Sequence, residues 1–140
     1  MADKIAIAPL LDQLGMHFIE GGWPGAIPRD TEFFEAVKAK RPFHRAAFAA
    51  FGATRKAGVA VEQDQQVLAL LNSGAEFVTL VAKSDIRHVE RALRTDGDEN
   101  LAMVRDTVEF LRREGREVIL DAEHFFDGYR FNSEYTRSVI

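Results

Sequence analysis

Short apolar runs alternate with amphipathic stretches along the whole chain, and this alternation restricts the fold more than any other feature. The clearest run, residues 77–82, is short and contains β-branched residues, which is typical of a buried strand. Further strands are predicted at residues 16–20, 45–51 and 118–120. Strands separated by helices form right-handed βαβ units around a parallel sheet. The sequence therefore predicts an α/β protein.

The predicted helices follow the spacing of apolar residues and the expected caps. The segment 46–50, Ala-Ala-Phe-Ala-Ala, could also form a helix. We predict a strand there, because Gly52 follows at once and the neighbouring segments alternate regularly. The first helix is expected to begin at about Ala8, or to be kinked there by Pro9, and to end at Gly15. A second is expected at 32–40, capped by Asp30 or Thr31, and a third around 67–71. A long helical region is expected from 86 to 115 with a break near 96–98, and a last helix after Asn132 or Ser133.

The composition indicates one soluble domain over residues 1–140: the chain is 46% hydrophobic and 29% charged, with a net charge of −4. The mild acidity and the lack of a basic, aromatic platform argue against nucleic-acid binding. The chain has no cysteine, which excludes disulfides and thiolate chemistry and fits a reducing compartment. No apolar run is long enough to cross a bilayer and no leader is recognisable, so we expect a cytoplasmic protein without a membrane partner.

Two architectures fit the alternation, a doubly wound open sheet and a part of a (β/α)8 barrel. A complete barrel needs about 250 residues, so this chain would supply roughly half of one. No linker or low-complexity tract divides it.

Acidic residues follow the last predicted strand directly. Asp121 and Glu123 share one face of that strand, because successive side chains point to opposite faces. In α/β proteins, ligands bind at the carboxyl ends of the strands. The alternative is a solvated junction between strand and loop, with Asp127-Gly128 as an ordinary turn.

Four segments together resemble the citramalate synthase branch of the 2-isopropylmalate and homocitrate synthase family: Ile-Glu-Gly-Gly-Trp-Pro at 19–24, Ala-Phe-Gly-Ala-Thr-Arg at 50–55, residues 98–106, and Asp-Ala-Glu-His-Phe-Phe-Asp-Gly-Tyr at 121–129. The resemblance covers essentially the whole chain. It implies a TIM barrel of the pyruvate carboxyltransferase/HMGL-like type. This chain would supply helix 1 to the start of helix 5, a partial barrel.

The family implies an acyltransferase that condenses acetyl-CoA with a 2-oxo acid in amino-acid biosynthesis: pyruvate to citramalate, or 2-oxoisovalerate to 2-isopropylmalate. The family uses a divalent metal, Mg or Mn, held by an aspartate of the first strand and a His-x-His pair. Neither motif occurs here, and His17, His44, His88 and His124 are isolated from one another. We therefore expect no tight metal binding and no activity from the 140-residue chain alone.

The resemblance also assigns site residues. Glu123 is expected to be catalytic, as a general base or proton relay; otherwise it is a loop carboxylate. Substrate-binding residues are expected to be Glu20, Thr54, Arg55, Lys83, Ser84, Asp121 and His124. Lys83 could bind a carboxylate or a CoA phosphate, although a snorkelling lysine is an equal alternative. Ser84 could instead be a helix cap, Arg55 a solvated charge and His124 a structural histidine.

A non-catalytic function is the second hypothesis. An incomplete barrel has open sheet edges, and such edges favour self-association. A homo-oligomer is therefore expected. A flavodoxin-like nucleotide binder is disfavoured, because no phosphate-binding glycine pattern opens a helix.

Overall fold

The computed structural model describes residues 2–40 and 42–140. It contains one parallel sheet of β1 (Phe18–Glu20), β2 (Ala47–Ala53), β3 (Phe77–Lys83) and β4 (Glu117–Glu123), in the order β1-β2-β3-β4. Every neighbouring pair is parallel. Each strand pairs with the next one in sequence, without the reversal that marks a doubly wound sheet. This confirms the α/β class and the partial barrel.

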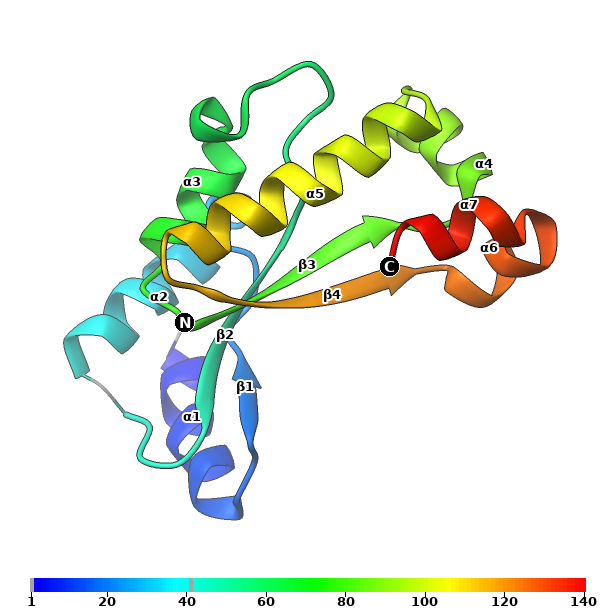
Figure 1. Ribbon diagram of the computed structural model, residues 1–140. Helices are drawn as coiled ribbons and strands as arrows, with labels where there is room; N and C mark the ends of the chain where they lie inside the picture. The colour runs from blue at the N-terminus through cyan, green and yellow to red at the C-terminus, as the bar shows by residue number, and fades with distance from the viewer. Residues whose placement is uncertain (1, 41) are drawn as a thin grey trace.

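Helices pack on one face of this sheet (Figure 1). The longer helices are α1 (Ala2–Leu14), α2 (Pro28–Lys40), α3 (Gln65–Asn72) and α5 (Gly97–Arg113). The shorter ones are η1 (Val61–Gln63), α4 (Ile86–His88), the π-helix η2 (Val89–Leu93), α6 (Phe125–Phe131) and α7 (Ser133–Ser138). The main core joins α2, α3 and α5 to the sheet through Phe34, Ala50, Val67, Leu70, Val78, Leu80, Phe110 and Leu111.

The two faces of the sheet differ strongly in burial. In β3 the residues Val78, Leu80 and Ala82 are buried under the helices, while the alternate residues are only partly buried. On the other face Phe18 and Ile119 are 52% and 39% exposed. That second face, which would line the inside of a closed barrel, carries no helix in the described part of the chain (Figure 1).

The start of the first helix near Ala8, the cap at Asp30 and the alternative of a turn at Asp127-Gly128 were wrong. Helix α1 begins at Ala2 and contains Pro9. Helix α2 begins at Pro28, a residue favoured in a first helical turn. Asp30 therefore does not cap the helix, contrary to the prediction. Its carboxylate accepts a hydrogen bond from the Trp23 backbone N–H at 2.8 Å and pairs with Lys4. Asp127 and Gly128 lie inside α6 rather than in a turn.

Other local predictions are confirmed. The alanine-rich segment is strand β2, which runs to Ala53. The long helical region is interrupted before α5, whose cap is Asp96. Asn132 caps α7 by accepting a hydrogen bond from the Tyr135 N–H at 3.0 Å.

Candidate functional site

The carboxyl ends of the strands carry most of the predicted site residues. Lys83 and Glu123 end β3 and β4, and they are register partners on the uncovered face. Glu20 ends β1 on the same face but lies level with Ala49, which is level with Phe77 at the start of β3. The structure therefore brings Lys83 and Glu123 together and leaves Glu20 apart from them.

Lys83 and Glu123 form an ion pair between the Lys83 Nζ and the Glu123 Oε2. Their side chains keep 24% and 34% of their exposure, so both charged groups remain open to a small molecule. A carboxylate here can accept a proton, and an ammonium can bind an anionic group.

A cleft of about 390 Å³ lies beside this pair, at the carboxyl ends of β2 and β3. Polar and charged residues supply part of the wall, and apolar residues supply the rest. A mainly apolar pocket with a few polar groups is typical of a small-molecule site. The π-helix η2 forms part of the wall, and π-helices are frequent at functional sites. The lining consists of Ala53, Thr54, Arg55, Lys56, Ala57, Val81, Lys83, Ala92, Leu93 and Met103.

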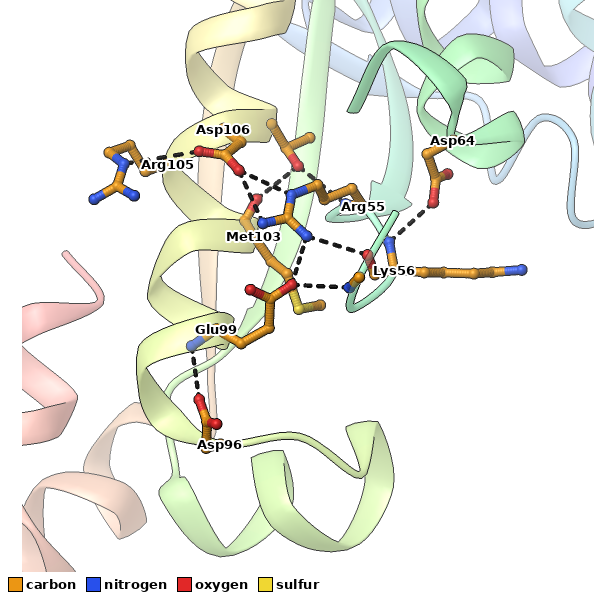
Figure 2. Close-up of polar contacts among 10 residues, drawn as sticks. Arg55, Lys56, Asp64, Asp96, Glu99, Met103, Arg105 and Asp106 are labelled. Carbon is orange, nitrogen blue, oxygen red and sulfur yellow. Dashed lines mark hydrogen bonds and ion pairs between the residues drawn. The ribbon is translucent and has the colours of Figure 1, made fainter. Parts of the chain in front are cut away.

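Arg55 is directed toward α5 (Figure 2). Its Nη1 lies 2.7 Å from the Glu99 Oε1, and its Nη2 lies 2.8 Å from the Asp106 Oδ2. The hydrogen bond that Arg55 donates to the Glu99 carboxylate is the main cause that raises the pKa of Arg55, and the same bond lowers the pKa of Glu99. The Arg55 side chain is 8% exposed, and it donates hydrogen bonds to Glu99 and Asp106 of α5 and to the Lys56 carbonyl, so its substrate-binding role stays a prediction.

The loop after β2 is held by side chains at three backbone N–H groups (Figure 2). The Arg55 N–H donates to the Thr107 Oγ1 at 2.9 Å, and the Lys56 N–H donates to the Asp64 Oδ2 at 2.9 Å. The Gly58 N–H donates to the Glu99 Oε1 at 3.0 Å. This loop, which carries Thr54 and lines the cleft, is therefore fixed on both sides.

Ser84 is completely buried, and its hydroxyl donates to the Glu123 carbonyl at 2.6 Å. Two residues to which the sequence analysis gave no role, Thr136 and Asn100, hold the same part of the backbone. The Thr136 hydroxyl donates to the Ser84 carbonyl at 2.8 Å, and the Asn100 amide donates to the Lys83 carbonyl at 2.9 Å. No local sequence pattern predicts the hydrogen bonds of these two residues, because their partners are remote in sequence.

The two remaining predicted residues lie at the same rim. Asp121 is an exposed residue of β4, in register with Val81 and on the same face as Glu123. His124 has a positive φ of 60° and precedes α6. Its ring lies against that of His88, with 4.2 Å between the centroids. The substrate roles of Asp121 and His124 remain predictions.

A divalent metal needs several converging ligands. Among residues 2–40 and 42–140, no group of three His, Asp or Glu side chains is placed to hold a metal ion. In the same ranges, no helix combines the length and the apolar character needed to cross a bilayer.

Successive parallel strands, helices on one face and a charged pair at the strand tips define a partial (β/α)8 barrel. The chain belongs to the HMGL-like family, whose sequence pattern matches residues 1–134. This confirms the resemblance noted from the motifs.

Several curated relatives are similar over the whole chain. It is 61% identical over 140 residues to the (R)-citramalate synthase of Streptomyces coelicolor, and covers 26% of that protein. It is 48% identical over 140 residues to the (R)-citramalate synthase of Synechocystis, and 49% identical over 140 residues to that of Aquifex aeolicus, covering 25% and 26% of them. The chain thus spans about 26% of the length of such relatives.

Proposed function

We propose that this chain is part of the catalytic barrel of an acyltransferase of the citramalate synthase type, and that the carboxyl ends of its strands form part of the active site. The longer protein condenses acetyl-CoA with a 2-oxo acid, and pyruvate gives citramalate for isoleucine biosynthesis in the cytoplasm. The observation that carries the proposal is the Lys83–Glu123 pair at the mouth of the half barrel, beside the cleft. The 61% identity to a protein named (R)-citramalate synthase supports pyruvate over 2-oxoisovalerate.

Glu123 is the proposed general base. Its carboxylate takes a proton from the methyl group of the acetyl thioester, and the resulting carbon nucleophile forms a bond to the keto carbon. The π electrons of the keto group move to its oxygen, which takes up a proton and becomes the hydroxyl group of the product. Lys83 holds the carboxylate of the 2-oxo acid near Glu123 through a charge-assisted hydrogen bond. Addition of water then cleaves the thioester and releases the CoA thiol. Thr54 and Asp121 would line the substrate.

Mg²⁺ or Mn²⁺ is the cofactor expected of the longer protein. The described residues do not form a metal site, so no step in this proposal passes through a metal. We expect the 140-residue chain alone to show no turnover.

The test compares two substitutions on the same face of β4, in the longer protein. Glu123→Gln removes the proposed base, and we expect a loss of about 100-fold or more in CoA release from acetyl-CoA and pyruvate. Glu117→Gln is the matched control, because Glu117 is an exposed glutamate at the opposite end of the strand. We expect it to retain activity. Equal turnover of the two variants would rule out Glu123 as the base.

The second candidate function is a non-catalytic half barrel that self-associates. It is favoured by the exposed apolar side chains Phe18 and Ile119, and by β1 and β4, each of which pairs on one side only in the described structure. Sedimentation of the 140-residue chain tests it. Concentration-dependent dimers would support self-association, and a monomer at all concentrations would contradict it.

A further inference from the structure

Three backbone carbonyls at the rim each accept a hydrogen bond from a buried side chain. Asn100 donates to the Lys83 carbonyl at 2.9 Å, Thr136 to the Ser84 carbonyl at 2.8 Å, and Ser84 to the Glu123 carbonyl at 2.6 Å. Ser84 and Thr136 are 0% exposed and Asn100 is 1% exposed. Buried polar groups that are fully paired in this way fix the local backbone.

These carbonyls lie where the sheet ends. Lys83 and Glu123 are the last residues of β3 and β4, so the ordinary ladder of the sheet stops beside them. The Ser84 N–H still donates to the Glu123 carbonyl at 3.1 Å. The Ser84 hydroxyl adds a second bond to that same carbonyl. The side chains therefore extend the pairing of the two strands by one step and hold the backbone from which the ion pair projects.

Helices α5, α6 and α7 converge on this point. The Asn100 amide of α5 also contacts the Tyr135 hydroxyl of α7, at 2.8 Å. Gly128 of α6 lies so close that an added Cβ would be 2.7 Å from the Ser84 carbonyl oxygen. In Figure 1, α6 and α7 lie past the tips of β3 and β4. Much of the backbone after Lys83 is thus enclosed by segments that follow β4 in the chain.

We propose that Thr136, acting through Ser84, is a positioning residue for the Lys83–Glu123 pair. The segment α6–α7 would then be a working part of the site, although the Lys83 and Glu123 side chains form their hydrogen bond with each other and not with this segment. The expected effect on kcat rests on the proposed function, whereas the expected change in the position of Lys83 relative to Glu123 does not. Loss of the Thr136 hydroxyl frees the Ser84 backbone, and the register of Lys83 against Glu123 loosens.

The kinetic test uses the longer protein. Thr136→Val keeps the shape of the side chain and removes its donor, whereas Thr136→Ser keeps the donor. A displacement of about 1 Å at a reacting group can cost roughly 100-fold in rate, so we expect Thr136→Val to lower kcat by about 10- to 100-fold. KM for acetyl-CoA should change by less than about twofold, because the loosened Lys83 is proposed to hold the 2-oxo acid. Thr136→Ser should restore most of kcat.

The control is Ser138→Ala, which removes another hydroxyl of α7 whose hydrogen bond, to the Glu134 carbonyl, stays within the helix. It should leave kcat and KM unchanged. Ser84→Ala removes the hydroxyl bond to the Glu123 carbonyl and keeps both backbone bonds of residue 84, so it should lower kcat in the same direction as Thr136→Val. It serves as the decisive variant where Thr136→Val fails to fold. A wild-type kcat in either folded variant would overturn the proposal.

A second measurement separates this inference from the proposed function. The Lys83 ammonium signal of the 140-residue chain, observed by nitrogen NMR, should move toward that of a free lysine in Thr136→Val and not in Ser138→Ala. An unchanged signal would overturn the positioning role. If the signal moves while Glu123→Gln retains full turnover, the positioning role stands and the assignment of Glu123 as base fails.

Discussion

Replacement of Arg55 by methionine should destabilise the chain more than any comparable change at an exposed arginine. The guanidinium is 8% exposed and bonds to both Glu99 and Asp106. Removing one partner of a fully buried ion pair costs about 3–5 kcal/mol, because the other charge is left unpaired. Here the two carboxylates are 30% and 37% exposed, so water can solvate part of the charge. We therefore expect a loss of about 1.5–3 kcal/mol.

Urea unfolding of the 140-residue chain, followed by circular dichroism, measures this loss. A lower midpoint at an unchanged slope reports a change in stability rather than in compactness. Arg113→Met is the matched control, because the Arg113 side chain is 61% exposed and its Nη2 lies 3.4 Å from the Oε1 of an exposed Glu62. Its effect should stay within about 0.5 kcal/mol. Arg55→Lys should fall between the two, since lysine keeps the charge but loses the fork of donors. Equal midpoints for Arg55→Met and Arg113→Met would refute the reasoning.

Two further predictions concern the rim. The ion pair with Arg87 lowers the pKa of Asp85 from 3.8 to about 2, so this group stabilises the fold above about pH 4, and the contribution is lost as pH falls through about 2. Asp85→Asn should remove that part of the acid dependence of the urea midpoint; an unchanged acid dependence would contradict the pairing. Gly128→Ala should lower the free energy of unfolding by about 1–3 kcal/mol, because the added Cβ meets the backbone of Ser84 and Asp85. Alanine is the better helix former, so a stabilised variant would show that α6 has room there.

The elements that could be predicted from the sequence are those whose pattern is local. The apolar run of β3 and the Asn132 cap of α7 each require only neighbouring residues, and both are confirmed. The ambiguous segment at 46–50 was decided by its surroundings, and it is strand β2. The spacing of Asp121 and Glu123 placed two acidic residues on one face at a strand end, where the structure has them.

The features that could not be predicted depend on partners far along the chain. Pro9 lies inside α1, between the buried residues Ala8 and Asp12. Asp12 accepts hydrogen bonds from the backbone N–H groups of His44, Arg45 and Ala46, which lowers its pKa. Asp30 looked like a cap, but it binds Trp23 and Lys4 instead. The Thr136 hydroxyl donates to the carbonyl of Ser84, which lies far from it in the sequence. Such contacts override local preference.

The uncovered face of the sheet makes the two proposed functions alternatives. Lys83 and Glu123 project on that face because they share it with Val81 and Asp121, away from the helices. If the remaining strands of the longer protein close the barrel, the pair lies inside the mouth, and the apolar side chains Phe18 and Ile119 become buried. If a second copy of the chain covers the face, Phe18 and Ile119 are buried in the dimer interface instead. A longer protein whose apolar face stays accessible to a hydrophobic dye would contradict closure by its own strands, and with it the proposed enzyme.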